Sequence, residues 1–255
     1  MSKLSRSTLK RCIHYWLDHP PLSATTVKGV YYLICDGTFL EHRTGIYAVM
    51  NAETHTLVYA VFNVPEGARM LTTIYQALVA LGISPRSATV DGNPQQIKYL
   101  RLAWPTLKLQ RCVVHVQRQG LSWCRRNPKR TDAKYLRRIF LRLSSVRTSS
   151  HADRLIADVA AWEKRFGLAL DHSSDRGWVF SDLLRARSML LKALPDMFHY
   201  IYNPLIPKST NALESYFSRL KEHYRHHRGL ALHHRDAYFK WYFYLVNGKK
   251  SSNTK

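Results

Sequence analysis

The chain has 255 residues, of which 45% are hydrophobic, and this is enough to bury one sizeable core together with a smaller accessory unit. It carries 39 Lys and Arg against 17 Asp and Glu, and the resulting net charge of +22 destabilises a compact chain by self-repulsion unless a polyanion neutralises it. The composition therefore excludes a disordered chain. It predicts nucleic acid as the partner, with an anionic membrane surface as the weaker alternative.

Membrane, secreted and disulfide-rich proteins do not fit the sequence. No apolar run approaches the roughly 18 residues of a membrane span, and residues 1–21 lack the apolar segment of a signal peptide. We therefore expect an intracellular protein without a membrane partner. The cysteines have irregular spacing, without a disulfide framework or a C-x-x-C zinc pair. They are Cys12, Cys35, Cys112 and Cys124.

Residues 3–18 have the period of an amphipathic helix, which the segment DHPPLS ends. The apolar side of this helix carries Leu9, Ile13, Trp16 and Leu17. The helix is either the last helix of a DNA-reading helix-turn-helix or a helix that packs on the core, and we favour the second interpretation.

Three β-rich runs follow at residues 27–40, 45–53 and 55–64, and their short turns predict an antiparallel meander. Residues 66–83 then form a helix whose expected buried face consists of Leu71, Ile74, Leu78 and Leu81.

The next segment alternates between strand and helix. Residues 86–91 predict a strand, residues 93–104 a helix with Asn93 as its N-cap, and residues 106–114 a strand that enters another helix. Together with the meander, this order predicts an α/β fold, an RNase H-like mixed sheet flanked by helices.

From residue 116 to residue 205 no strand pattern intervenes, and helices are expected at 134–143, 151–166 and 181–194. The middle helix places Leu155, Val159, Trp162 and Phe166 on one stripe. This segment is therefore predicted to be an all-helical insertion.

Two acidic residues follow predicted strands. Asp36 ends the run YYLICD, which is apolar enough to be buried on both faces, and an unpaired carboxylate there would be costly to desolvate. Asp91 ends the run ATVD, at the strand edge where open α/β sheets carry their sites. Each acid alone is more often a turn or helix cap than a ligand.

A third acid, Glu214, lies near the start of a basic helix. The apolar stripe of this helix consists of Leu213, Phe217, Leu220 and Tyr224. The adjacent polar stripe consists of Asn211, Glu214, Ser218, Lys221 and Arg225. A lone glutamate of this kind usually belongs to a solvated face, paired here with Lys221 or Ser218. Three acids together, however, suit metal-dependent chemistry on phosphodiesters, because two Mg²⁺ ions need shared carboxylates.

Four segments carry a family resemblance: CDGTFL (35–40), VDGN (90–93), QRCVVH (110–115) and STNALES (209–215). In this order they resemble the DDE transposases of the mutator-like type and their bacterial insertion-sequence relatives, over residues 28–225. The resemblance implies that Asp36, Asp91 and Glu214 are the catalytic triad and bind two Mg²⁺ or Mn²⁺ ions.

The resemblance also implies the partners and the supporting residues. The partners would be double-stranded DNA, as transposon ends and target, and further copies of the chain in a homodimer or larger assembly, in the bacterial cytoplasm or nucleoid. Cys112 and His115 would be the family's C-x-x-H motif, and Asn211 the asparagine of its T-N-x-x-E motif. The residues expected to bind DNA are Arg111, Arg118, Ser218, Lys221, Arg225, Arg228 and Trp178.

The predicted organisation has five parts. They are an N-terminal helix that includes a candidate remnant of a DNA-binding region (1–27), the first part of the core (28–115), the helical insertion (116–205), the C-terminal catalytic helix (206–246) and a flexible tail (247–255). Members of the family usually carry a DNA-binding region ahead of the core, and here about 28 residues precede the first strand. A non-catalytic DNA-binding derivative and a purely hydrolytic RNase H-like nuclease are therefore the alternatives.

Other residues allow competing interpretations. By spacing, Cys112 and His115 are half a zinc site, but Cys124 and His151 are poorly arranged to complete it, so we expect the pair to brace the helix behind the active site. Trp162 and Trp178 are candidates to stack on an extruded base; core packing is favoured for Trp162. The histidines near the C-terminus alternate with arginines, which is typical of a nucleic-acid surface. They are His223, His226, His227, His233 and His234.

Overall fold

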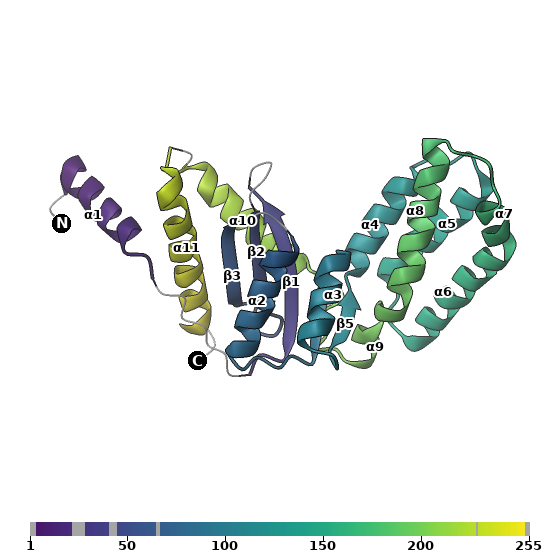
Figure 1. Cartoon of the computed structure of the whole chain (residues 1–255), viewed down its shortest axis with the longest axis horizontal. Helices are drawn as coiled ribbons and strands as arrows, with labels where there is room; N and C mark the ends of the chain where they lie inside the picture. The colour runs from purple at the N-terminus through teal and green to yellow at the C-terminus, as the bar shows by residue number, and fades with distance from the viewer. Residues whose placement is uncertain (1–3, 22–28, 41–44, 65–66, 228, 253–255) are drawn as a thin grey trace. The chain divides into compact units, whose positions relative to one another are not determined.

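The computed structural model describes residues 4–21, 29–40, 45–64, 67–227 and 229–252 (Figure 1). The chain folds as two compact units, the first made of Met1–Pro85 with Asn211–Lys255 and the second of Arg86–Thr210. Within the described residues the strands form one mixed five-stranded sheet in the order β3-β2-β1-β4-β5. The fold is therefore α/β, as predicted.

The first unit contains the antiparallel meander and the helices around it. Its elements are α1 (Arg6–Asp18), β1 (Tyr32–Phe39), β2 (Gly45–Asn51), β3 (Leu57–Val64), α2 (Ala68–Ala80), α10 (Asn211–Arg225) and α11 (Leu232–Ser252). Both β1 and β3 pair antiparallel with β2, which confirms the meander. In β1 the apolar residues from Tyr32 to Cys35 are buried, as their sequence predicts for a strand covered on both faces.

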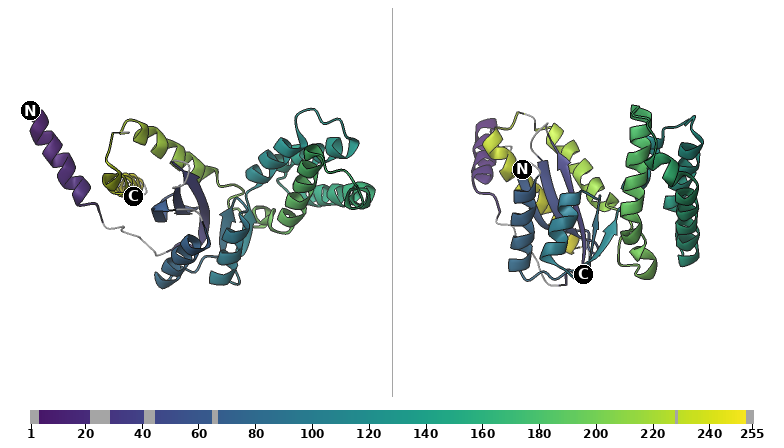
Figure 2. Two further views of the ribbon diagram at one scale, coloured as in Figure 1. Left: turned by 45° about the horizontal axis from the view of Figure 1, so that its top comes forward. Right: turned by 45° about the vertical axis from the view of Figure 1, so that its right-hand side comes forward.

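Helices cover both faces of the meander (Figures 1 and 2). On one face, Ile34 and Met50 share a core with Phe217 of α10 and Phe239 of α11. On the other face lies α2, where the hydroxyl of Tyr75 is 2.6 Å from that of Tyr47. Amphipathic helices explain this arrangement, because each buries its apolar stripe against the sheet.

The second unit joins a parallel strand pair to a group of helices. Its main elements are β4 (Ser87–Val90), α3 (Pro94–Ala103), β5 (Lys108–Arg111), α4 (Val113–Cys124), α5 (Thr131–Arg142), α6 (Ser149–Trp162), α7 (Leu168–Asp171), α8 (Trp178–Ala193) and α9 (His199–Tyr202). A π-helical turn, Glu163–Gly167, links α6 to α7, and short 3₁₀ turns at Leu143–Ser145 and Leu194–Asp196 follow α5 and α8. The expected helical character of residues 116–205 is confirmed, although the first helix begins at Val113.

The helices of this unit enclose their own core. Phe140 of α5, Leu155 of α6 and Leu190 of α8 are buried together. Trp162 also lies in this core, 4% exposed, and donates its indole N–H to the Asp132 carbonyl oxygen at 2.9 Å, so the packing interpretation of Trp162 is confirmed. Helix α4 approaches α5 closely at Gly120, where an added Cβ would lie 2.2 Å from the Phe140 ring.

The N-terminal helix α1 differs from the sequence-based prediction that it packs on the core. No residue of α1 is buried, and Trp16 on its apolar side is 55% exposed. The helix meets α11 through polar and ring-edge contacts, including a 2.7 Å hydrogen bond from the Trp241 indole N–H to the Trp16 carbonyl oxygen. These contacts do not cover the apolar stripe, so the interpretation of α1 as a helix packed on the core is not supported.

Two further boundaries differ. Leu81 is 41% exposed, because α2 ends at Ala80 and Leu81 is its C-cap. The sequence predicts a flexible tail at residues 247–255. Helix α11 instead continues through residue 252, and residues 253–255 lie outside the described range. The continuation is anchored by Asn247, whose amide exchanges two 3.1 Å hydrogen bonds with the Leu57 backbone. Across the described residues, none of the helices combines the length and hydropathy of a membrane span.

Candidate functional site

Asp36 lies where the burial of β1 ends. It is 7% exposed, and one carboxylate oxygen accepts a 2.8 Å hydrogen bond from the Gly37 N–H. The strand itself continues to Phe39, so Asp36 is inside the strand rather than at its last residue. Side chains two residues apart share a face of a strand, so Asp36 lies on the same face as Ile34, and its register partner Ala48 belongs to the core formed with α10.

Glu214 is in the first turn of α10, which packs on β1. The neighbouring Leu213 and Phe217 are buried against the sheet, as predicted, and Glu214 at the border of this stripe is partly buried. A carboxylate in the first turn of a helix is favoured by the helix dipole. Asp36 and Glu214 thus belong to the same face of the first unit's sheet.

Asp91 belongs to the second unit and directly follows β4. One carboxylate oxygen accepts a 3.0 Å hydrogen bond from the Asn93 N–H, and the Asn93 side chain caps α3 by accepting from the N–H of Gln95. Asn93 is therefore confirmed as the N-cap. Its bond to Asp91 fixes the turn between strand and helix, as an Asx turn does.

The backbone conformation of Gly92 and the closeness of Arg111 explain why a glycine follows Asp91. Gly92 has a φ of +110°, and an added Cβ would lie 1.9 Å from the Arg111 guanidinium. Arg111 is 7% exposed and donates to the Asp91 carbonyl oxygen at 3.4 Å. Burial lowers the pKa of Arg111, and the negative charge of Asp91 opposes this shift. A buried guanidinium is poorly placed for a DNA backbone, so the structure favours a positioning role for Arg111 over the expected phosphate contact.

The C-x-x-H motif meets the residue that precedes α10. The Cys112 sulfur accepts hydrogen bonds from the N–H of His115 at 3.5 Å and from the N–H of Thr210 at 3.4 Å. The Thr210 hydroxyl is 3.6 Å from the same sulfur and 3.3 Å from Nδ1 of His115. Burial raises the pKa of the Cys112 thiol, but the hydrogen bonds from His115 and Thr210 outweigh it, and the net pKa is lowered.

Further bonds hold the segment 207–210 in place. The Thr89 hydroxyl donates to the Pro207 carbonyl oxygen at 2.7 Å, and the Val113 N–H donates to the Lys208 carbonyl oxygen at 2.9 Å. The C-x-x-H pair is thus hydrogen-bonded to the segment that precedes α10; its expected bracing role stays a prediction. Sequence reasoning did not identify Thr210 as its partner, although this threonine directly precedes Asn211 in the quoted motif.

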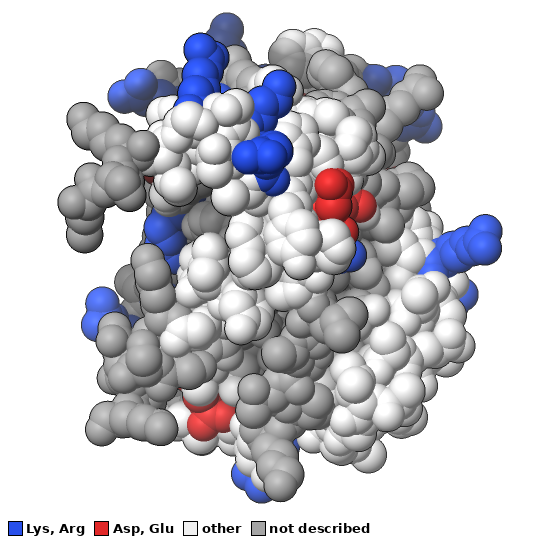
Figure 3. Space-filling view, turned by 90° about the vertical axis from the view of Figure 1, so that its left-hand side faces the viewer, with Lys and Arg blue, Asp and Glu red and all other residues white. Residues whose placement is uncertain are grey.

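The candidate DNA-binding residues differ in exposure. Arg118, Ser218 and Arg225 are exposed, whereas Lys221 is partly buried; Arg228 lies outside the described residues. Asn211, the asparagine of the T-N-x-x-E motif, is also exposed. Burial lowers the pKa of Lys221, and the nearby charge of Arg225 lowers it further. Figure 3 shows the side of the molecule that carries α1 and α11, where Lys and Arg side chains gather toward the upper part and acidic side chains are few. Trp178 is 70% exposed.

The donor chemistry of the three acids fits a hard cation. Carboxylate oxygens are the ligands that Mg²⁺ and Mn²⁺ prefer, and the Asp36 side chain lies at a position that is only 7% exposed. In the part of the chain that the structure describes, no group of three or more His, Cys, Asp or Glu side chains is arranged to hold a metal ion.

No protein-family model matches the chain, and no curated protein matches it.

Proposed function

We propose that the chain is the catalytic core of a DDE-type DNA transposase, built on an RNase H-like fold. The observation that carries the proposal is the contact between the two motifs, in which Cys112 and His115 bind Thr210 directly before the helix of Glu214. Thr210 directly precedes Asn211, the first residue of this helix, and Glu214 lies in the helix's first turn. The placement of Asp36 and Glu214 on one sheet face and the glycine-dependent turn after Asp91 support the same proposal.

The reaction needs no ATP and no covalent enzyme intermediate. Water attacks a phosphodiester at a transposon end, the P–O3′ bond breaks, and the 3′-oxygen leaves with a proton as a free 3′-hydroxyl. This hydroxyl then attacks a target phosphodiester, so one P–O3′ bond forms as another breaks. Two Mg²⁺ or Mn²⁺ ions, held by Asp36, Asp91 and Glu214, would supply Lewis-acid activation of the attacking and leaving oxygens.

The chain's own cations bind the substrate. DNA is a dense polyanion, and a chain with 22 excess positive charges gains affinity from counterion release at every phosphate contact. Lys221 and Arg225 follow Glu214 by about two and three turns on the same polar stripe of α10, so they are the proposed phosphate contacts beside the acid. Strand transfer joins two transposon ends to one target, and this suits an assembly of two or more copies.

A strand-transfer assay tests the proposal. The full chain is incubated with Mg²⁺ and duplexes taken from the DNA that flanks its gene, and joined products are separated from cleaved ones on sequencing gels. Joining supports the transposase, cleavage without joining indicates a purely hydrolytic nuclease, and binding without cleavage indicates a non-catalytic DNA-binding protein.

The matched variants are Glu214→Gln and Glu222→Gln. Both remove one negative charge from α10, but Glu222 is exposed and lies more than two turns further along the helix. Glu214→Gln should abolish cleavage and joining without weakening metal-free DNA binding, and Glu222→Gln should be active. Normal cleavage by Glu214→Gln would place this glutamate on an ordinary solvated face and refute its catalytic role.

A further inference from the structure

Trp178, the first residue of α8, is largely exposed. It is 70% exposed, compared with 55% for Trp16 in the first unit and 4% for Trp162 in its own unit. Indole rings contribute large apolar areas to cores and interfaces. An exposed ring therefore indicates a binding site where its surroundings also favour a ligand.

A guanidinium group covers one face of this ring. The Arg125 guanidinium carbon is 4.0 Å from the centroid of the Trp178 ring, and its Nη2 donates to Asp182 at 2.7 Å. Arg125 has a φ of +63° and ψ of 168°, a backbone region that side-chain-bearing residues rarely adopt. Its Nε is buried and has no hydrogen-bond partner within the described residues. The strained backbone, the ion pair and the stacking together hold a cation against the indole.

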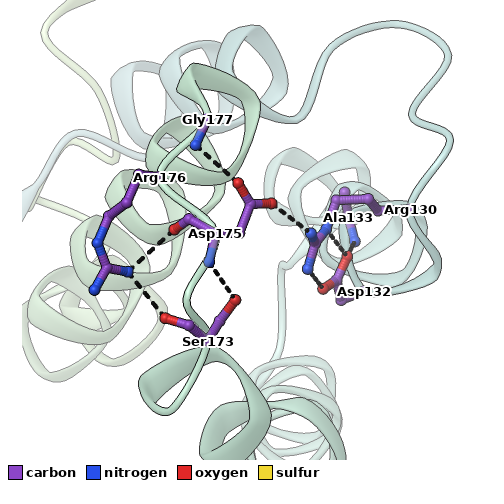
Figure 4. Close-up of polar contacts among 7 residues, drawn as sticks. All are labelled: Arg130, Asp132, Ala133, Ser173, Asp175, Arg176 and Gly177. Carbon is purple, nitrogen blue, oxygen red and sulfur yellow. Dashed lines mark hydrogen bonds and ion pairs between the residues drawn. The ribbon is translucent and has the colours of Figure 1, made fainter.

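The loop that leads to Trp178 is also fixed (Figure 4). Asp175 accepts a 2.8 Å hydrogen bond from the Gly177 N–H and receives Arg130 at 3.3 Å, while its own N–H donates to the Ser173 hydroxyl at 3.2 Å. Arg130 is in turn paired with Asp132 of α5 at 2.8 Å. These bonds orient the start of α8 and keep the ring in one place, which reduces the entropy that a binding partner must overcome.

The surroundings of the ring are cationic. The segments 125–132 and 175–185 contain six Lys and Arg residues and three Asp residues. The cations are Arg125, Arg126, Lys129, Arg130, Arg176 and Arg185. Of these, Arg126, Lys129, Arg176 and Arg185 are exposed; Arg185 is also 3.5 Å from the Asp182 carboxylate, and the excess of cations over acids leaves positive charge for an anionic backbone.

We propose that Trp178 and Arg125 form a stacking site for an unpaired nucleobase, with the surrounding cations binding the adjacent phosphates. Single-stranded nucleic acid is recognised by aromatic rings that stack on bases next to a positively charged surface, and every base offers such a face. Bases in a duplex are already stacked on their neighbours, so the site selects unpaired over paired strands. This ligand class depends on the nucleic-acid function proposed above, but it does not depend on the catalytic role of the three acids.

Binding to short oligonucleotides without metal tests the inference. The probes are a single strand of about 12 nucleotides that carries one 2-aminopurine, a length within the site sizes of single-strand-binding surfaces, and its duplex. The proteins are the full chain, Trp178→Ala, Trp178→Phe and Tyr202→Ala. Tyr202 is the matched control, because it is an aromatic residue of the same unit, is 73% exposed, and lies beyond the other end of α8.

Trp178→Ala should weaken single-strand binding by about 5- to 150-fold at constant salt, the range of one lost base stack, and should remove the quenching of 2-aminopurine. Trp178→Phe should retain most of the affinity, and Tyr202→Ala should bind like the parent chain. Duplex affinity should change little in all variants. Because the ring is exposed, Trp178→Ala should also keep the unfolding temperature of the parent chain.

Two outcomes would overturn the inference. Unchanged single-strand affinity in Trp178→Ala, or an equal loss on single strands and duplexes, would show that no base stacks on the indole; the nucleic-acid function itself would stand in that case, because duplex binding by the parent chain is measured in parallel. If the parent chain binds neither probe, both this inference and the proposed function are wrong.

Discussion

Replacing Thr210 by valine should destabilise the chain, because it removes a buried hydroxyl while keeping the shape of the side chain. Thr210 is 0% exposed, and its hydroxyl lies 3.3 Å from Nδ1 of His115 and 3.6 Å from the Cys112 sulfur. Water cannot replace these contacts at a buried position. Leaving buried polar groups without a partner costs about 1–3 kcal/mol, and because both contacts are long we expect about 1–2 kcal/mol here.

Urea and thermal unfolding measure this effect. A loss of this size should lower the unfolding temperature by roughly 2–8 °C in a chain of this length. The matched control is Thr73→Val, since Thr73 is exposed on α2 and donates its hydroxyl to the Arg69 carbonyl oxygen at 3.0 Å. Water can take over that hydrogen bond, so this variant should stay within about 0.5 kcal/mol of the parent chain.

A double-mutant cycle tests whether the lost stability comes from the contact between Thr210 and His115. In a His115→Ala background, Thr210→Val should cost clearly less than in the parent chain, because one partner of the hydroxyl is already gone. If the bracing positions Glu214, Thr210→Val should also slow Mg²⁺-dependent cleavage without changing metal-free duplex affinity. A Thr210→Val variant as stable as Thr73→Val, or strictly additive costs in the cycle, would refute the bracing role of the contact.

Three further outcomes are expected. Gly92→Ala should lower the free energy of unfolding by roughly 1–3 kcal/mol, because it combines a φ of +110° with a Cβ placed 1.9 Å from the buried Arg111 guanidinium; chemical denaturation that finds no loss would contradict this geometry. Lys221→Ala combined with Arg225→Ala should weaken binding to all duplex sequences alike and make the salt dependence of log K shallower by about one unit per lost phosphate contact, as titrations at several salt concentrations can measure. Burial raises the pKa of the Cys124 thiol from its usual value of 9.0 to about 12. The unfolded chain therefore loses this proton first as pH rises, so between the unfolded pKa of 9.0 and the folded pKa of about 12 this group lowers the free energy of unfolding by about 1.4 kcal/mol per pH unit. Cys124→Ala should show a correspondingly shallower decline of stability with pH in urea unfolding.

Local sequence patterns determined the elements and the positions of the acids within them. The run from Tyr32 to Cys35 is apolar at every position, which predicts a strand covered on both faces, and this is how β1 is buried. Asn93 before Pro94 is a helix start by side-chain chemistry alone. The apolar stripe of α10 was equally readable, since a period of 3.6 residues defines which side of a helix is apolar.

Contacts between residues distant in sequence were decided by the tertiary structure. Cys112 and Thr210 are 98 positions apart, and no local pattern indicates that the thiol accepts hydrogen bonds from this threonine. The same holds for Arg111, whose charge predicted a phosphate contact. In the folded chain its guanidinium lies against Gly92 and is buried.

The sequence likewise indicated which side chains are apolar, but not which of them are buried. Trp162 and Trp178 both lie in helices of the second unit, yet one is buried in the core and the other stands in solvent beside Arg125. The apolar stripe of α1 is as regular as that of α10, but no residue of α1 is fully buried. Periodicity specifies which face of a helix is apolar, whereas its burial depends on whether another element covers that face, and this is a property of the whole fold.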